Sequence, residues 1–334
     1  LVNTRLGHEQ NAKLLDMAGV AAVVSDRPFD HYRFIDAVDM STPPLAGEAF
    51  APRWADQIAL CSSGTSGQPK LCVYDGSAIS AQIFNSLYVL KRNPTIKTYY
   101  KGKIKLLAFL PFYHIFGLVA NLLWFSFFGR SFVFLRELSA AGVMDACKRH
   151  GVTHVFAIPL LFNAIAAGVR KKAQELGASE QLEKALRLSI RLQTLLPRLG
   201  ARFVRGVLMR GIRQRALGPS VRFCITGGGF VGSDTLYLCN ALGYALYNGY
   251  GMTEIGIGSV ELRLRARDRL SGSVGRPFPS AAYKIENGEL LVNGPTLFSA
   301  MLEDGNLIAR DPEAWYATGD MARCDEDGFY YIDG

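Results

Sequence analysis

Short apolar runs that alternate with helix-like segments constrain the fold of this chain most strongly. Residues 106–110, 153–157 and 221–226 have the length and the apolar content of buried strands. Segments 77–92 and 140–149 have the composition of helices. Because each such helix returns the chain across a face of the sheet, the strands are expected to pair mostly in parallel. The sequence therefore predicts the α/β class, with mostly parallel sheets flanked by helices.

Two parts of the chain interrupt this alternation. Residues from about 160 to 216 contain no strand signal and are predicted to form two or three helices, one of them with a basic face. From Ser271 onward, short strands and turns such as Asn287-Gly288 indicate a small β-rich subdomain. We therefore expect an α/β core over residues 1–270, with the helical insert inside it, and a subdomain over residues 271–334.

The loop between two strand-like runs, 58–61 and 71–74, has the composition of an anion-binding segment. Its glycines allow positive φ and leave room for a phosphate, and its backbone N–H groups, its hydroxyls and Lys70 are donors. A flexible Ser/Gly linker is the alternative interpretation. Only two residues separate Gly64 from Gly67, whereas the Walker pattern requires four. The loop therefore predicts phosphate binding without identifying a reaction.

Three further loops each follow a strand-like run, at residues 111–117, 226–232 and 248–254. Ligands of an open parallel sheet bind at the carboxyl ends of its strands. We therefore expect these loops and the 62–70 loop to face one cleft.

A dinucleotide-binding fingerprint is present as well. Gly227, Gly229 and Gly232 have the G-x-G-x-x-G spacing between a predicted strand and a predicted helix. The acid that would bind a ribose should lie at the tip of the second strand, but Glu254 comes six residues after the end of that strand. An NAD-linked oxidoreductase is therefore an alternative that leaves the 62–70 loop unexplained.

Three motifs in a fixed order resemble those of the adenylate-forming (AMP-binding) ligases. They are Ser62-Ser63-Gly64-Thr65-Ser66-Gly67-Gln68-Pro69-Lys70, Tyr250-Gly251-Met252-Thr253-Glu254 and Tyr316-Ala317-Thr318-Gly319-Asp320. The run Leu110-Pro111-Phe112-Tyr113-His114-Ile115-Phe116-Gly117 resembles that of the acyl-CoA synthetase branch. The helical, basic segment before residues 226–229 is similar to that of long-chain fatty acyl-CoA synthetases.

This resemblance implies an ATP-dependent activation of a fatty acid, with a long chain suggested by the helical insert. The carboxylate attacks the α-phosphate of ATP to give acyl-AMP and pyrophosphate. A thiol, from coenzyme A or from the phosphopantetheine of an acyl carrier protein, then takes the acyl group. ATP, Mg²⁺ and coenzyme A are the implied cofactors. Besides the NAD-linked oxidoreductase, a non-enzymatic nucleotide-binding remnant is the remaining alternative.

The resemblance also implies the site residues, motif by motif. The β- and γ-phosphates are assigned to Ser62, Ser63, Gly64, Thr65, Ser66, Gly67 and Lys70. Adenosine is assigned to Gly228, Gly229, Asn248, Gly249, Tyr250, Gly251 and Asp320, with Tyr250 stacked on the base and Asp320 on the ribose hydroxyls. Thr253 is assigned to the α-phosphate, and Glu254 and Thr65 to Mg²⁺. The acid is assigned to His114, Phe116, Gly117 and Gly227. Lys70, His114, Thr253 and Glu254 are the candidate catalytic residues.

The resemblance covers nearly all of this chain but only part of a family member. The family continues past Gly334 into a hinge and a small mobile domain that carries the adenylation lysine. The chain as given is therefore expected to bind nucleotide but to adenylate poorly.

The net charge of +8 comes from one segment. Residues 170–215 contain 12 Lys and Arg against three Glu, so the rest of the chain is close to neutral. This local basicity does not indicate nucleic-acid binding. It leaves two interpretations: a loose association with an anionic membrane, or a solvated helix face.

The cysteines and the apolar stretches bear on the location. Six cysteines without a C-x-x-C pair indicate neither a zinc site nor a disulfide framework, and they favour a reducing, cytoplasmic compartment. The longest uncharged apolar stretch, residues 115–129, is shorter than the roughly 20 residues of a membrane-spanning helix. The expected location is therefore the cytoplasm, with or without association with a membrane.

Overall fold

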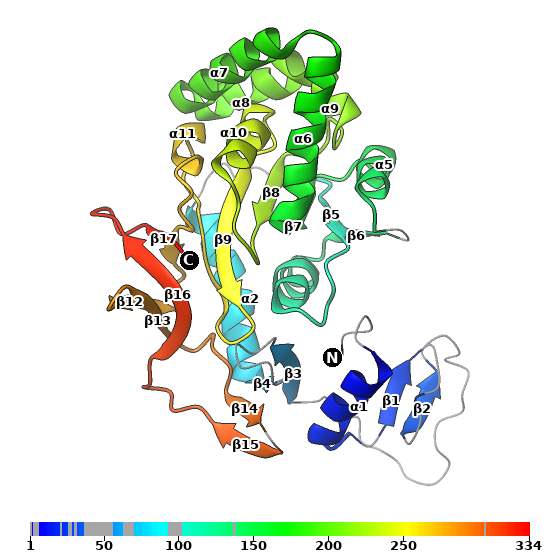
Figure 1. The fold of residues 1–334 in the computed structure, drawn as a ribbon, viewed down its shortest axis with the longest axis vertical. Coiled ribbons are helices and arrows are strands. Elements are labelled where there is room, and N and C mark those ends of the chain that lie inside the picture. Colours follow the sequence, from blue (N-terminus) through cyan, green and yellow to red (C-terminus); the bar gives the residue numbers. More distant parts are fainter. Residues whose placement is uncertain are drawn as a thin grey trace. The chain divides into compact units, whose positions relative to one another are not determined.

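A computed structural model describes residues 2, 7–20, 22–25, 29, 32–36, 56–62, 70–92, 102–135, 138–303 and 305–334 (Figure 1). It divides into two compact units. The first unit comprises residues 1–76 and 298–310, and the second comprises residues 77–297 and 311–334. The division that the sequence predicts at residue 270 stays a prediction.

The first unit contains helix α1 (His8–Met17) and two small sheets. Strands β1 (Ala22–Ser25) and β2 (Arg33–Asp36) pair in parallel. The second sheet has the order β15-β14-β4-β3, with β3 (Gln57–Ser62), β4 (Lys70–Asp75), β14 (Ala300–Glu303) and β15 (Asn306–Ala309).

The predicted strands around the 62–70 loop are present, but they form an antiparallel hairpin in which Ser62 lies opposite Lys70. The expectation that this loop follows a strand of the parallel sheet is therefore wrong. Residues 63–69 themselves lie outside the described residues.

A seven-stranded sheet with the order β11-β10-β9-β8-β7-β5-β6 forms the centre of the second unit. Its strands are β5 (Lys105–Ala108), β6 (Ser131–Phe134), β7 (His154–Ala157), β8 (Phe223–Thr226), β9 (Leu246–Met252), β10 (Gly256–Val260) and β11 (Arg276–Pro277). The five neighbouring strands β6, β5, β7, β8 and β9 run parallel to one another. Strand β10 pairs antiparallel with β9 on one side and with β11 on the other. The predicted α/β class, with a mostly parallel sheet, is confirmed.

Helices cover this sheet on both faces (Figure 1). They are α2 (Gly76–Arg92), the π-helix η1 (Phe116–Leu123), α4 (Trp124–Phe127), α5 (Ala140–His150), α6 (Pro159–Glu175), α7 (Ser179–Leu195), α8 (Pro197–Phe203), the π-helix η2 (Val204–Leu208), α9 (Arg210–Arg215), α10 (Ser233–Ala241) and α11 (Ala266–Arg269). Local signals set their ends. Ser139 caps α5 by accepting a hydrogen bond from the Gly142 N–H at 3.0 Å, and Gly151 ends it with φ of 61°.

The two faces of the sheet have different cores. On one face, Leu107, Val155 and Cys224 pack with buried side chains of α5, α6, α7 and α10. On the other, aromatic rings dominate: the Phe125 ring centroid lies 5.4 Å from that of Phe156. Consecutive residues of these strands are thus buried on opposite faces of the sheet. The strands are therefore continuous hydrophobic runs in the sequence.

A second sheet of the same unit has the order β12-β13-β16-β17 and is antiparallel. Its strands are β12 (Ala282–Glu286), β13 (Glu289–Asn293), β16 (Tyr316–Cys324) and β17 (Tyr330–Ile332). It corresponds to the predicted β-rich region. In this region the sequence predicts short strands at residues 283–286, 289–292 and 329–332. The motif that ends in Asp320 lies within a further strand, β16.

The predicted helical insert is present as α6 to α9. Arg170 of α6 forms ion pairs with Glu183 of α7 and Asp234 of α10. The buried Arg213 of α9 donates to the Leu242 and Pro219 carbonyls at 3.0 and 3.1 Å. Arg170 therefore ties α6 to α7 and α10, and Arg213 ties α9 to the segments that follow α9 and α10.

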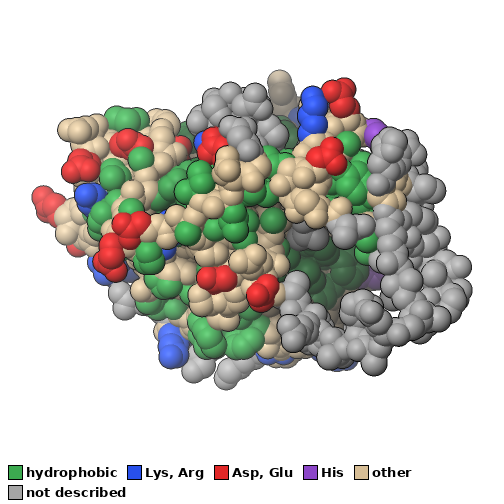
Figure 2. Space-filling view, turned by 90° about the horizontal axis from the view of Figure 1, so that it is seen from below, with side chains coloured by type: hydrophobic (Ala, Val, Ile, Leu, Met, Phe, Trp, Pro, Cys, Tyr) green, Lys and Arg blue, Asp and Glu red, His purple; other side chains and the backbone are tan. Residues whose placement is uncertain are grey.

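Charge elsewhere is mixed. On the face drawn in Figure 2, acidic side chains are spread among hydrophobic ones, and the Lys and Arg side chains are scattered. Within the described part of the chain, we find no helix with the length and apolar character needed to cross a membrane.

His154 makes the stability of this fold depend on pH. The imidazole is fully buried between the Phe125 and Phe223 rings, and burial, followed by Arg222 and Arg130, lowers its pKa to about 3. The unfolded chain binds this proton near pH 6.5, so stability should fall as the pH drops from about 6.5 towards 3. We expect His154→Leu to weaken that pH dependence, measured by urea unfolding at several pH values.

The control for this measurement is His150→Gln, at the exposed end of α5. It should retain the pH dependence of the unsubstituted chain. An unchanged pH dependence in His154→Leu would contradict the assignment to this histidine.

Candidate active site

Three of the four predicted loops meet at one edge of the parallel sheet. Strands β5, β8 and β9 run in the same direction, so their carboxyl ends share that edge. A Cβ at Gly227, after β8, would lie 3.2 Å from the Gly249 carbonyl oxygen and 3.8 Å from the Phe116 ring. Gly227 thus permits the close approach of two backbones next to an aromatic wall.

The segment after β5 turns sharply into η1. The His114 N–H donates to the Pro111 carbonyl at 3.2 Å, and the His114 carbonyl accepts from the Leu118 N–H at 2.9 Å. A Cβ at Gly117 would overlap the Pro111 carbonyl, so only glycine fits there. The apolar sequence after residue 116 predicts a helix that begins near Gly117, and its first eight residues, Phe116–Leu123, form a π-helix. This form is often found at functional sites.

Tyr250 of β9 and Asp320 of β16 form a side-chain hydrogen bond between the two sheets of this unit. The Tyr250 hydroxyl donates to Asp320 Oδ2 at 2.6 Å. Burial, followed by this hydrogen bond, raises the pKa of Tyr250 well above its usual value, so the phenol keeps its proton. Thr318 and its neighbours fix the carboxylate, because the Thr318 hydroxyl donates to the Leu290 carbonyl at 2.7 Å and accepts from the Asp320 N–H at 3.2 Å.

Thr253 and Glu254 lie in the tight connection from β9 to β10. Glu254 is buried, with 8% of its surface exposed. Gly256 follows with φ of 74°, and a Cβ there would overlap the Gln82 side chain. The turn is therefore compact and built against α2.

Gln82 fastens this turn. Its amide Nε2 donates to the Ile255 carbonyl at 3.2 Å and to the Thr296 carbonyl at 2.9 Å, and its Oε1 accepts from the Ile257 N–H at 3.0 Å. The side chain is fully buried. Three backbone partners in the interior fix the segment that carries Thr253 and Glu254.

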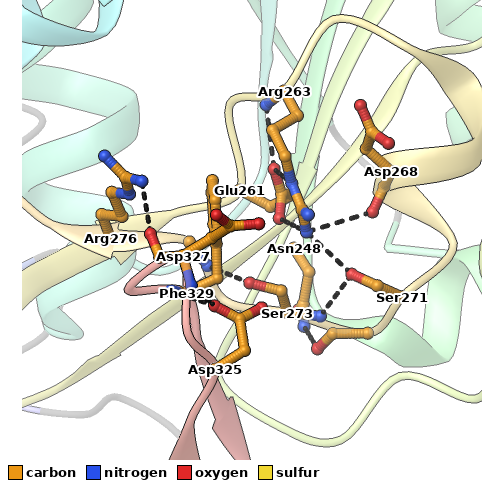
Figure 3. A network of polar contacts seen from close by, with 12 residues as sticks. Asn248, Glu261, Arg263, Asp268, Ser271, Ser273, Arg276, Asp325, Asp327 and Phe329 are labelled. Carbon is orange, nitrogen blue, oxygen red and sulfur yellow. Dashed lines mark hydrogen bonds and ion pairs between the residues drawn. The ribbon is translucent and has the colours of Figure 1, made fainter.

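A polar network that includes Glu261 and Arg263 fixes the backbone at Asn248 (Figure 3). The Asn248 carbonyl accepts from the Glu261 N–H at 2.7 Å. Glu261, whose side chain is 1% exposed, accepts from Arg263 Nε at 2.9 Å and from Arg263 Nη2 at 2.6 Å. The Arg263 guanidinium lies 3.9 Å above the Phe329 ring. The network ties β9 to the turn that precedes β17.

Comparison with known proteins decides the family. The family model described as "AMP-binding enzyme" matches residues 2–302. The chain belongs to the AMP-binding enzyme family.

Curated relatives of this family member include several acid–CoA ligases. The long-chain-fatty-acid–CoA ligase FadD15 of Mycobacterium bovis is 27% identical over 96% of this chain and 53% of its own length. The 2-succinylbenzoate–CoA ligase of Geobacillus sp. is 28% identical over 99% of this chain and 61% of its own length. The chain thus spans a little over half the length of these relatives.

Solved structures confirm the fold of this AMP-binding family member. O-succinylbenzoate coenzyme A synthetase (MenE) from Bacillus subtilis, in complex with ATP and magnesium ion, superimposes with a TM-score of 0.70. The two chains are 21% identical over 99% of this chain and 63% of that one. The α/β sheets described above are therefore those of an AMP-binding enzyme.

The predicted residues fall into both compact units. The second unit contains His114, Phe116, Gly117, Gly227, Gly228, Gly229, Asn248, Gly249, Tyr250, Gly251, Thr253, Glu254 and Asp320. Ser62 and Lys70 belong to the first unit, where Lys70 forms an ion pair with Glu303 at 2.9 Å. Ser63, Gly64, Thr65, Ser66 and Gly67 lie outside the described residues.

The glycine fingerprint has the strand–loop–helix context that a dinucleotide site needs. Gly227 follows β8, and Gly232 is the N-cap of α10. The family match favours an AMP-binding enzyme over the NAD-linked oxidoreductase, because it accounts for the whole segment. The alternative function is therefore not supported.

Sequence reasoning missed the residues that support the site. Gln82, Glu261 and Arg263 belong to no motif. The partners of Gln82 are backbone groups far along the chain, whereas Glu261 and Arg263 pair with each other. A glutamine on the apolar face of a helix was the one available signal for Gln82, since a buried amide requires partners.

Replacing Gln82 should be costly. Gln82→Leu keeps the volume but leaves the Ile257 N–H and two carbonyls without their buried partner, which we expect to lower the free energy of unfolding by about 3 kcal/mol. Gln181→Leu, at an exposed position of α7, should change it by less than about 0.5 kcal/mol. Urea unfolding monitored by circular dichroism measures both, and equal values would contradict the role of Gln82.

Proposed function

We propose that this chain is the nucleotide- and acid-binding part of an AMP-forming acid–thiol ligase. The observation that carries the proposal is the Tyr250–Asp320 pair at the edge of the parallel sheet, beside Gly227 and Gly249. An aromatic face with a carboxylate bonded to its rim suits a nucleoside, because the ring can stack on the base and the carboxylate can accept from ribose hydroxyls. The family match supports this assignment.

The proposed reaction has two steps. An oxygen of the acid's carboxylate attacks the α-phosphorus of ATP, the bond to the β-phosphate oxygen breaks, and pyrophosphate leaves. A thiolate sulfur then attacks the acyl carbon of acyl-AMP, and AMP leaves with the electrons of the cleaved carbon–oxygen bond. Two anions meet in the first step, so the protein has to supply donors where charge collects.

Individual residues have distinct tasks in this proposal. Thr253 donates to the α-phosphate, Lys70 and the 62–67 loop hold the outer phosphates, and His114 lies beside the acid's carboxylate. The acid enters along Phe116, next to Gly117 and Gly227, where the backbone segments pack closely.

Glu254 suits Mg²⁺ because proteins bind this ion through one or two carboxylates together with substrate phosphates. Among the described residues there is no cluster of three acidic, histidine or cysteine side chains, so the phosphates would supply further oxygen ligands. When bound, the ion neutralises charge on the phosphates. Thr65 is proposed as a further ligand.

A fatty acid with a long chain is the proposed substrate. The support is the helical insert α6–α9 and the similarity to FadD15, whereas the 2-succinylbenzoate ligase is the competing relative. Coenzyme A or carrier-protein phosphopantetheine is the proposed thiol.

Nucleotide binding tests the site. Asp320→Asn should weaken AMP binding about tenfold, because it removes the charge of the acceptor for the ribose hydroxyls. Tyr250→Phe should weaken it less, through loss of the bond that orients Asp320. Tyr331→Phe is a matched control, since Tyr331 donates to Asp325 Oδ2 at 3.0 Å in a second Tyr–Asp pair. Calorimetric titration measures all three, and equal losses in the control would contradict the assignment.

Acyl-sulfamoyl adenosines, which mimic acyl-AMP, test the substrate class on the same chain. We expect the hexadecanoyl compound to bind more tightly than AMP and more tightly than the succinylbenzoyl compound. Tighter binding of the aromatic compound would overturn the fatty-acid assignment. Binding of NADH with no response to ATP and Mg²⁺ would overturn the ligase, and AMP binding without any gain from an acyl group would favour a nucleotide-binding remnant.

A further inference from the structure

An apolar stripe lies on the outside of the helical insert. Leu199 and Phe203 of α8 and Val207 of η2 are 68%, 48% and 64% exposed. They are spaced four residues apart, so they line one side of this continuous helical segment. Leu195 and Leu196, at the end of α7, are 68% and 54% exposed and extend the exposed apolar surface in sequence. We refer to these five residues as the apolar stripe.

The opposite side of α8 explains why the stripe points outward. Gly200, Ala201 and Val204 are buried, and a Cβ at Gly200 would overlap the Leu192 carbonyl of α7. The helix is thus packed through its small residues, and its large apolar residues are left in solvent. A contiguous exposed apolar surface of this kind marks an interaction site.

Arginines border the stripe. Arg198 and Arg202 are exposed and precede Leu199 and Phe203 by one position, so they form a parallel row on the helix. The stretch from Lys184 to Ser233, with both ends included, contains ten Lys and Arg and no acidic residue. Two arginines of the helical insert, Arg170 and Arg213, have partners within the second unit. Arg198 and Arg202 face solvent.

We propose that the apolar stripe and the row formed by Arg198 and Arg202 dock this chain on the surface of an anionic membrane. Helices that lie in a membrane interface combine large apolar side chains on one side with Lys or Arg at the border, where the cations meet lipid phosphates. A positive field without intervening acids complements a negative lipid surface, whereas a buried protein–protein core would have to desolvate the arginines. The inference needs neither the nucleotide nor the acid, so it is independent of the proposed function.

Sedimentation with vesicles tests the proposal without any substrate. The chain should bind vesicles of phosphatidylcholine and phosphatidylglycerol at low salt, and bind vesicles of phosphatidylcholine alone much less. The double variant Arg198→Glu with Arg202→Glu should lower the partition coefficient by about tenfold or more, since each arginine contributes near such a surface. Added salt should weaken binding of the unsubstituted chain by a similar factor.

A second double variant separates the apolar contribution. Leu199→Glu with Phe203→Glu should abolish binding to the anionic vesicles while leaving the circular dichroism spectrum unchanged, because both side chains are already exposed. Leu307→Glu is the control, since Leu307 is 60% exposed in the first unit. It should bind as the unsubstituted chain does.

Three outcomes would overturn the proposal. One is no binding to anionic vesicles at low salt, and another is binding that neither double variant reduces. The third is a dimer in sedimentation equilibrium that Leu199→Glu with Phe203→Glu dissociates without changing vesicle binding, which would assign the stripe to a second copy of the chain.

Discussion

The buried amide of Gln82 is the interaction on which the second unit most depends. It joins helix α2 to the backbone on both sides of Gly256 and to the segment before residue 298. The indole N–H of Trp124 donates to the Gln82 carbonyl at 2.7 Å, which adds α4 to the same point. Because amides in an apolar interior are costly unless paired, this arrangement admits one relative position of these elements. The turn that carries Thr253 and Glu254 inherits that precision.

Side chains connect the two sheets of this unit at the candidate site. The Tyr250–Asp320 hydrogen bond, the Tyr283 ring and the Arg263–Phe329 contact all connect β9 and β10 with the second sheet. The nucleoside site proposed there is thus built from two sheets, and the polar network drawn in Figure 3 supports the strand that carries Asn248 and Tyr250.

Much of this arrangement follows from the sequence, and the exceptions have physical reasons. The strand–helix alternation predicted β5, β7, β8 and β9 and the α/β class, because buried parallel strands are continuous apolar runs. Asp320 was identified by its motif, but β16 was not expected, since exposed and buried residues alternate irregularly along it. The antiparallel pairing of β3 with β4 was also missed, because a local sequence pattern does not specify the pairing partner of a strand. The role of Gln82 was missed, since its partners are backbone groups more than 170 residues away.

The ion pair between Lys70 and Glu303 lowers the free energy that an anion gains by binding at Lys70. Lys70 already has a carboxylate at 2.9 Å, and both side chains are partly exposed. An incoming phosphate therefore exchanges one anionic partner of Lys70 for another, and the released Glu303 returns to water. The net gain is a difference between two charge pairs. Selectivity at this lysine then reflects how much better a multiply charged oxyanion competes than a single carboxylate, and not the strength of attraction to a bare ammonium group.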